Sequence, residues 1–302
     1  MTTFDSFIIG QPSLDINTDY EGHTIREIGG AVVYSGFAAA ALGHPTCVLP
    51  KASSATVDVD QIFSAAKHIT VVKLESPQST SIENIYHTAN KERRTCRAIS
   101  RIQGYSTAEI PNADAKIYHL AGLMRGDIDN EIIEYAQKKA MVAVDVQGFL
   151  RCADEKTGGM SFHDWPEKLS MLPLIRFLKT DAAEAEILTG LTDRAEAART
   201  LYGWGAQEVM ITHNTEVLVY DGKRIYTQPI KSRNLSGRSG RGDTCFSSYI
   251  TERLKEDIVQ ALLTAAALVS LKMEKPGPFN GTRTDVEAYI KEFYTTEAGQ
   301  GR

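Results

Sequence analysis

Short apolar runs bounded by turn residues alternate with helix-patterned segments through most of the chain. Runs of this length that are rich in β-branched residues predict buried strands. The predicted strands are Phe7–Gly10, Thr46–Leu49, Ile69–Leu74, Ile117–Ala121, Met141–Val146, Ile175–Lys179, Glu208–Thr212 and Val217–Tyr220. The predicted helices are Ala31–Leu42, Asp129–Lys139, Ala182–Leu188, Asp193–Tyr202, Thr244–Lys255, Ile258–Met273 and Val286–Thr295. Strands separated by helices of this length indicate βαβ units and a mostly parallel sheet.

Two polar regions, Asp15–Ile28 and Ser79–Ile99, interrupt this alternation. Both lack a helical pattern, and the second predicts a hairpin that turns near Ala89–Lys91. Polar alternating strands pack only one face, so we expect a small sheet projecting from the main body, with strands within residues 15–28 and 79–99. Such a projection serves as a lid or as a dimer surface. No linker or repeat divides the chain, which we interpret as one domain over residues 1–302.

The composition is typical of an ordinary globular protein, with 42% hydrophobic and 24% charged residues among 302. A net charge of −5 and a pI near 5.9 disfavour nucleic acid or an anionic membrane as a partner. The four cysteines form no CxxC pair, which disfavours zinc and a disulfide scaffold. Because no signal-peptide pattern and no apolar run of about 18 residues is present, we expect a cytoplasmic protein.

The segment SGRSGRGDTCF, residues 236–246, precedes a predicted helix that begins at Thr244. Glycines at 240 and 242 allow positive φ and close approach of the backbone, so that consecutive N–H groups converge on an anion. Asp243 follows as a carboxylate that can accept a proton from an attacking hydroxyl, as phosphoryl transfer requires. The alternative is a helix N-cap, formed by Asp243 or Thr244. The RGD tripeptide alone does not indicate a cell-adhesion ligand.

A second glycine pair, Gly29-Gly30, precedes the small-residue helix that Gly43 closes at its C′ position. Small residues in that helix serve its packing on the sheet, whereas the glycine pair also allows the backbone itself to contact a ligand. Asp15 lies just beyond the carboxyl end of the first strand, where ligands bind in open α/β sheets. It is either a hydroxyl-binding carboxylate or a turn-capping residue.

Together these motifs resemble the ribokinase-like (PfkB-type) family of sugar and nucleoside kinases. The resemblance rests on Asp15, on Gly29-Gly30, on KTDAAEAEILTG at residues 179–190 in place of the family's N-x-x-E box, and on GRSGRGD at residues 237–243. It extends from about residue 4 to residue 282 in the family's order. It implies a three-layer αβα fold with a mostly parallel sheet and a small projecting β-sheet lid.

The resemblance also implies a role for each matching residue. Asp243 would be the general base, beside an anion hole made by Gly240, Arg241 and Gly242. The substrate hydroxyls would be held by residues at the two early motifs, namely Asp15, Gly29, Gly30 and Tyr34. Magnesium would be organised through water by the N-x-x-E equivalents, Asp181 and Glu184. The alternative for Asp181 is a helix cap, and the alternative for Glu184 is a solvated first-turn acid.

The donor implied by the resemblance is ATP with Mg²⁺, and a monovalent cation and a homodimer through the small sheet remain open. The expected donor contacts are Thr212, Asn214, Arg238, Pro276, Gly277 and Asn280. The segment DVQGFLR, residues 145–151, supplies an acidic strand end and a nearby Arg, as the family often does.

This chain departs from the family's pattern at four places. Gly237-Arg238 stands for the usual Asp-Thr, Arg241 for Ala, Tyr34 for Asn, and Asn214 for the first Gly of the nucleotide loop. The arginines suggest a substrate unlike ribose or one that is negatively charged. Both could clamp phosphates, or Arg241 could point to solvent.

We therefore expect an ATP-dependent kinase that phosphorylates a hydroxyl of a sugar, an inositol or another polyol. One alternative is a nucleoside kinase, whose base would need an aromatic wall such as Tyr34, Phe37 or Tyr86. Another is a non-catalytic ligand-binding or regulatory protein with the same fold. A dehydrogenase of the Rossmann type lacks its GxGxxG fingerprint here.

Overall fold

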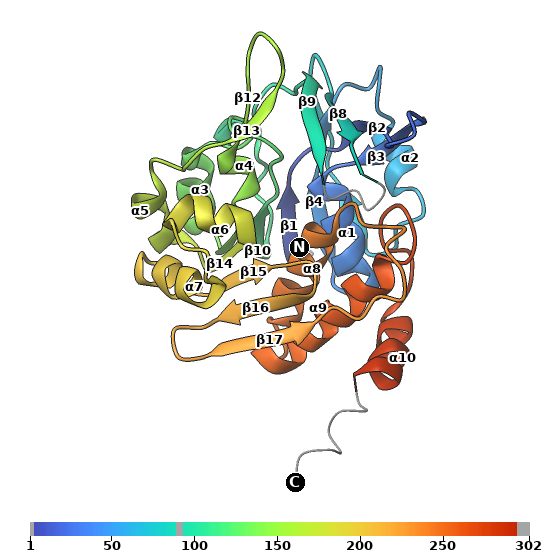
Figure 1. Cartoon of the computed structure of the whole chain (residues 1–302). Coiled ribbons are helices and arrows are strands. Elements are labelled where there is room, and N and C mark those ends of the chain that lie inside the picture. The colour runs from blue at the N-terminus through green and yellow to red at the C-terminus, as the bar shows by residue number, and fades with distance from the viewer. Residues whose placement is uncertain (1–2, 89–92, 295–302) are drawn as a thin grey trace.

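The computed structural model of the protein describes residues 3–88 and 93–294. Within these residues, nine strands form one large sheet in the order β17-β16-β15-β14-β11-β10-β1-β4-β6 (Figure 1). Its strands are β1 (Phe4–Ile9), β4 (Thr46–Leu49), β6 (Ile69–Val71), β10 (Ala115–Leu120), β11 (Met141–Asp145), β14 (Phe177–Asp181), β15 (Val209–Thr212), β16 (Glu216–Tyr220) and β17 (Ile225–Pro229). Every pairing from β6 through to β15 is parallel, and β16 and β17 add antiparallel strands at one edge.

The apolar runs of the sequence form the central strands of this sheet, as predicted. Their side chains are buried on both faces, which explains runs without alternation. Two strand predictions need correction. The predicted strand Ile69–Leu74 is divided into β6 and the short β7 (Leu74–Glu75). Strand β17 was not predicted, because its partly exposed sequence IYTQP is not a continuous apolar run.

Helices cover both faces of the large sheet, which confirms the three-layer αβα prediction. One layer contains α3 (Asn130–Gln137), α6 (Ala182–Thr189) and α7 (Arg194–Gly203). The other contains α1 (Ala31–Ala41), α8 (Arg241–Glu252), α9 (Ile258–Lys272) and α10 (Arg283–Phe293), on the opposite side of the sheet in Figure 1. Among the described residues, no helix is long and apolar enough to cross a membrane.

The remaining described elements are short. They are β5 (Lys51–Ala52), α2 (Val59–Phe63), α4 (Gln147–Leu150), β12 (Arg151–Ala153), β13 (Met160–Phe162), α5 (Lys168–Met171) and the 3-10 turns Thr107–Glu109 and Leu172–Leu174.

The two polar regions form a separate four-stranded sheet, called the small sheet below, in the order β3-β2-β8-β9. Its strands are β2 (Ser13–Thr18), β3 (Thr24–Gly29), β8 (Thr80–Tyr86) and β9 (Arg94–Ser100), which lie at the top of Figure 1. The prediction of a hairpin was correct for β8 and β9, while the turn predicted near Ala89–Lys91 lies outside the described residues.

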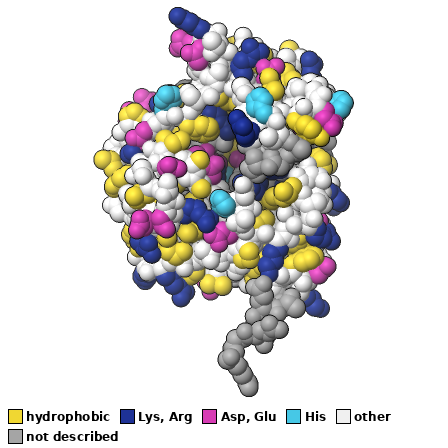
Figure 2. Space-filling view, in the orientation of Figure 1, with side chains coloured by type: hydrophobic (Ala, Val, Ile, Leu, Met, Phe, Trp, Pro, Cys, Tyr) yellow, Lys and Arg dark blue, Asp and Glu magenta, His cyan; other side chains and the backbone are white. Residues whose placement is uncertain are grey.

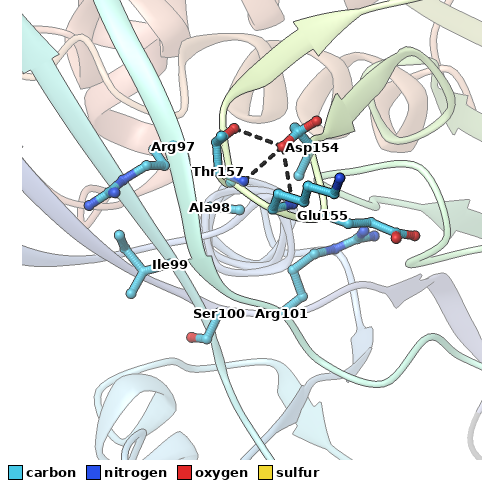
Figure 3. Close-up of a pocket in the computed structure, with 11 residues that line it drawn as sticks. Arg97, Ala98, Ile99, Ser100, Arg101, Asp154, Glu155 and Thr157 are labelled. Atoms are coloured by element: carbon cyan, nitrogen blue, oxygen red, sulfur yellow. Dashed lines mark hydrogen bonds between the residues drawn. The ribbon is translucent and has the colours of Figure 1, made fainter.

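The hairpin of β12 and β13 joins the main body to the free edge of the small sheet. The N–H of Ala98 on β9 donates to the carbonyl of Gly158 at 2.9 Å. A Cβ on Gly158 would lie 2.3 Å from the Ala98 carbonyl oxygen, so only glycine permits this approach. A groove of about 500 Å³ runs between β9 and residues 153–158; there the Asp154 carboxylate accepts hydrogen bonds from the turn that it closes (Figure 3).

Candidate active site

Polar side chains of the predicted site collect where the central parallel strands end. Asp145 ends β11, Asp181 ends β14, and the loop after β1 leads to Asp15 on β2. Carboxyl ends of parallel strands meet at one edge of a sheet, and here that edge lies beneath the small sheet. Figure 2 shows this face hollowed below the small sheet, with charged side chains around the hollow. The fold therefore places the early and late motifs around one space.

Helix α8 begins at Arg241, three residues earlier than predicted. Its N-cap is Gly240, at a φ of 70° in the left-handed region, so neither Asp243 nor Thr244 is the cap. Asp243 instead lies in the first helical turn, beside N–H groups that have no intrahelical acceptor. The positive end of the helix dipole and these N–H groups together suit an anion at this point.

The carboxyl group of Asp243 is tuned by its surroundings. Burial, reinforced by the charge of Asp145, raises the pKa of Asp243 to about 6, although Lys179 opposes the shift. A carboxylate with this pKa is ionised at neutral pH, yet it is a stronger base than an exposed aspartate. Asp243 therefore has the protonation behaviour that a general base needs.

Lys179, which the sequence analysis did not select, lies directly beneath the first turn of α8. A Cβ on Gly242 would be 3.2 Å from its Nζ. Its ammonium is 3.0 and 2.9 Å from the two carboxylate oxygens of Asp145 and 3.8 Å from Glu184 Oε2. Burial lowers the pKa of Lys179, but these carboxylates outweigh burial and raise it overall. A permanent positive charge thus lies next to the first turn of α8, residues 241–244, which is called the anion-binding turn below.

Asp181 and Glu184 form a capping box at the start of α6. Each backbone N–H donates to the other residue's carboxylate at 2.8 Å. Burial raises the pKa of Glu184, and the charge of the nearby Lys179 opposes the shift. One oxygen of each carboxylate remains outside the capping box, and oxygen ligands of this kind suit Mg²⁺. The pair therefore fits the magnesium that the resemblance implies, while also serving as the cap that was its alternative.

The inner face of the small sheet carries a continuous row of hydrogen-bonded polar side chains, called the polar row below. Asn17 donates to Glu27 at 2.8 Å, Asn84 donates to Asn17 at 3.0 Å, and Cys96 donates to Asn84 at 3.2 Å. Asn84 is paired with Asn17 and with Cys96 across neighbouring strands, and Glu27 lies diagonally from Asn17 on the same face, so the row spans all four strands. This row was not predicted from the sequence, because each of the four strands contributes a single member.

Asp15 lies next to the polar row and faces the glycine pair. Ser13 donates to its Oδ1 at 2.7 Å, and burial raises the pKa of Asp15. A Cβ on Gly29 would lie 2.4 Å from Asp15 Oδ2, and Gly30, at a φ of 101°, caps α1. The glycine pair thus allows the start of α1 to approach a buried carboxylate.

Tyr34 on α1 is buried among acidic groups. Burial, followed by the charges of Asp15 and Asp243, raises the pKa of its hydroxyl well above the usual range. The hydroxyl therefore stays protonated and can donate a hydrogen bond in the space between the two carboxylates.

Arg238, in the loop of residues 236–240 that is called the glycine loop below, and Arg241, which follows this loop, both contact Asn214. Arg241 Nη1 donates to Asn214 Oδ1 at 2.7 Å, and Arg238 Nη2 donates to the same oxygen at 3.3 Å. Both guanidinium groups therefore lie on the side of the anion-binding turn where the donor was expected. Thr212, by contrast, is buried and directs its hydroxyl to the Thr180 carbonyl at 3.4 Å.

The other expected donor contacts lie in the loop between α9 and α10. Pro276 and Asn280 are exposed, and Gly277 has a φ of 83° with open space around it. The start of this loop contacts the glycine loop, because the N–H of Gly237 donates to the Met273 carbonyl at 2.7 Å.

Arg151, at the start of β12, adds further positive charge to the site. Burial and the charge of Arg94 on β9 lower the pKa of Arg151. Its Nη2 donates to Gln147 Oε1 at 2.8 Å, and its guanidinium lies 5.5 Å from the ring centroid of Phe162. Two neighbouring guanidinium groups favour an anion between them.

Known proteins are similar to this chain in sequence and in fold. No protein-family model matches the chain. A pyrophosphate-dependent kinase in the ribokinase family, solved with a pyrophosphate analogue and myo-inositol, is 31% identical and has a TM-score of 0.84 over 94% of this chain and 99% of that one. Ribokinase of Arabidopsis thaliana, solved with ribose and ATP, has a TM-score of 0.74 at 16% identity over 96% and 99% of the two chains. Cytidine kinase of Thermococcus kodakarensis is 24% identical over 251 residues, which are 82% of this chain and 87% of that protein.

The fold and these likenesses define a phosphotransferase that acts on a hydroxyl group. The chain belongs to the ribokinase family.

Proposed function

We propose that the protein transfers a phosphoryl group from pyrophosphate to a hydroxyl of a cyclic polyol such as myo-inositol. The observation that carries the proposal is the position of Asp243, in the first turn of α8, within the influence of both Lys179 and Asp145. The 31% identity with a pyrophosphate-dependent kinase that binds myo-inositol supports the same reaction.

Asp243 acts as the general base in this proposal. It accepts the proton of the substrate hydroxyl while that oxygen attacks the phosphorus in line with the departing phosphate. The N–H groups of Gly242 and its neighbours in the first turn then stabilise the charge on the transferred group. Magnesium held through Asp181 and Glu184 would neutralise donor phosphate charge.

The polar row provides the acceptor site. Carboxylates such as Glu27 and Asp15 accept hydrogen bonds from hydroxyls, and the amide of Asn84 can both donate and accept. A ring with a hydroxyl on each carbon presents such groups in every direction, which matches a row that spans the whole small sheet. The Tyr34 hydroxyl adds a donor from the opposite side.

The arginines support pyrophosphate rather than ATP as the donor. Pyrophosphate has no base or ribose, so its affinity must come almost entirely from its charge. Arg238 and Arg241 supply paired guanidinium groups beside the anion-binding turn, where the family pattern has uncharged residues.

A nucleoside acceptor is the second candidate, supported by the 24% identity with a cytidine kinase. Two of the three aromatic residues expected to face a base are committed to packing. Phe37 stacks on Phe63 at 5.8 Å, and the ring of Tyr34 packs against Gly240. The third, Tyr86, accepts a hydrogen bond from Arg94 at its hydroxyl at 3.5 Å.

The test is a matrix of donors and acceptors. Pyrophosphate, ATP and ADP are each combined with inositols, hexoses, pentoses and cytidine, and phosphorylated product is followed by ³¹P NMR. We expect product from pyrophosphate with an inositol. Product only from ATP would refute the proposed donor, and product only from cytidine would refute the proposed acceptor. A protein that forms no product with any pair, although it is folded, would refute the proposed reaction as a whole.

A further inference from the structure

Lys272 places a buried ammonium group against the glycine loop. It is the last residue of α9, and its side chain is almost fully buried. Its Nζ donates to the carbonyl of Gly237 at 2.6 Å and to the carbonyl of Ser239. The same atom lies 4.9 Å from the ring centroid of Tyr34. A single positive charge is thus surrounded by two backbone oxygens and one aromatic face.

Neither Gly237 nor Ser239 belongs to a regular element, so their carbonyls depend on such contacts. The loop that contains them leads directly into Gly240 and the first turn of α8. Its other end is fixed on the α9–α10 loop, because a Cβ on Gly237 would overlap the carbonyl of Lys275. The position of the anion-binding turn is therefore set partly by what holds these two carbonyls.

Converging backbone carbonyls also bind alkali cations, which replace water with protein oxygens. The resemblance left a monovalent cation open for this protein. The residues present do not fit that ion at the glycine loop, because the Lys272 ammonium already occupies the space in front of both carbonyls.

We propose that Lys272 replaces a monovalent cation at this loop, so that the enzyme needs no added alkali ion. The inference rests on the proposed function, because it assumes that the turn which follows the glycine loop binds the donor phosphate. Lys272 acts as a positioning residue, since it holds the loop and does not touch the reacting atoms.

The electrostatics of the buried amine are consistent with this role. A buried ammonium is costly unless it is paired, and two carbonyls together with the face of Tyr34 offset that cost. Burial lowers the pKa of Lys272 to about 8, while the charges of Asp243 and Glu27 oppose the shift. The amine therefore remains mostly protonated at neutral pH.

The first experiment measures the wild-type enzyme in chloride salts of potassium, sodium, ammonium or tetramethylammonium at constant ionic strength. We expect the same kcat/KM in all four. Activity that depends on potassium or ammonium would overturn the proposal, and this measurement needs no variant.

The second experiment uses Lys272→Met, which keeps most of the length of the side chain but removes its ammonium group. In tetramethylammonium chloride we expect kcat to fall at least about tenfold, because the anion-binding turn loses its support. Potassium or ammonium should restore part of this loss. Full activity without these ions, or a loss that no ion restores, would each contradict cation replacement. Lys275→Met is the matched control, because that side chain is exposed on the adjoining loop.

Thermal unfolding gives a readout that is independent of catalysis. An ion that binds the folded state raises the midpoint of unfolding. Potassium should raise the midpoint of Lys272→Met relative to tetramethylammonium and leave the wild type and Lys275→Met unchanged. This result is obtained even if no donor and acceptor pair is active, so failure of the proposed reaction and failure of the cation inference are distinguishable. A potassium-specific rise in the wild type would overturn the inference.

Discussion

Gly240 and Tyr34 are packed so closely that a Cβ on residue 240 would lie 2.1 Å from Cγ of the Tyr34 ring. The contact joins the N-cap of α8 to the body of α1 and thereby fixes the anion-binding turn against the helix that begins at the glycine pair. Tyr34 was expected to contact substrate in place of the family's Asn. Its ring packs against Gly240 and supports the turn, while its contact with substrate stays a prediction.

We expect Gly240→Ala to damage both stability and activity. The substitution combines a strained positive φ with a steric overlap against Tyr34, which together should cost about 2–4 kcal/mol. Gly190→Ala is a matched control, because residue 190 has a similar φ of 74° but nothing within 4 Å of a Cβ. It should cost only about 1–2 kcal/mol and leave kcat unchanged. Urea unfolding and steady-state kinetics measure the two effects; equal losses in both variants would show that the Tyr34 contact is unimportant.

Asp243→Asn should lower kcat by at least about 10²-fold without loss of the fold, because an amide cannot accept the substrate proton. The wild-type kcat/KM should decline as the pH falls below about 6, following the raised pKa of Asp243. Near-normal turnover in the variant would contradict the role of Asp243 as the base.

The same variant should be more stable than the wild type at neutral pH. The pKa of Asp243 is raised from 3.8 to about 6 in the folded protein, so folding favours the protonated form. The contribution of protonated Asp243 to the free energy of unfolding is fully present below about pH 4, and it is lost as the pH rises through about 6. The midpoint of thermal unfolding of Asp243→Asn should therefore exceed that of the wild type at pH 7.5, and the difference should shrink towards pH 4. A lower midpoint than the wild type at pH 7.5 would contradict the raised pKa.

Lys179→Met should shift the acid limb of the pH–rate profile to higher pH. Lys179 opposes the raised pKa of Asp243, so loss of its charge lets that pKa rise further. The variant should also lose about 3–5 kcal/mol of stability, because Asp145 is left buried without its partner. The double variant Lys179→Met, Asp145→Asn removes both charges; it should recover stability and return the acid limb towards the wild-type position. An acid limb that does not move in the single variant would exclude this coupling.

Arg238→Ala and Arg241→Ala should each raise the KM for pyrophosphate by about 10–100-fold, as expected when a charge-assisted hydrogen bond to phosphate is lost. The KM for the polyol should change little. Arg224→Ala is the control, because Arg224 lies over Tyr226 at the turn between β16 and β17. An increase in the polyol KM alone would place the arginines in the acceptor site.

Much of the fold could be predicted because buried strands and capped helices leave local signals. The strand Thr46–Leu49 was predicted with the observed bounds, since a short apolar run between polar turns has few alternatives. The start of α8 was placed three residues late because Gly240 was not recognised as a left-handed N-cap. Glycine before a helix signals either a loop or a cap, and only the contact with Tyr34 distinguishes them.

The charged groups of the site were harder to predict, because tertiary packing determines their neighbours. Lys179 and Lys272 lie within or beside apolar segments, where a lysine usually extends to the surface. No local sequence pattern indicates that Lys179 contacts Asp145. Likewise, none indicates that Lys272 contacts the carbonyl of Gly237. The polar row was equally hard to predict, because each strand contributes one member and only the pairing of the strands brings the members together. The roles of the individual site residues and the dimer through the small sheet stay predictions.

The hydrogen bond between Ala98 and Gly158 has a mechanical consequence for access to the site. If the small sheet swings away while this bond persists, it must carry the β12–β13 hairpin with it, and Arg151 is the first residue of that hairpin. Opening the cavity and withdrawing a positive charge from it would then be one movement. The departure of a phosphorylated product, which Arg151 would otherwise attract, would be coupled to the entry of solvent.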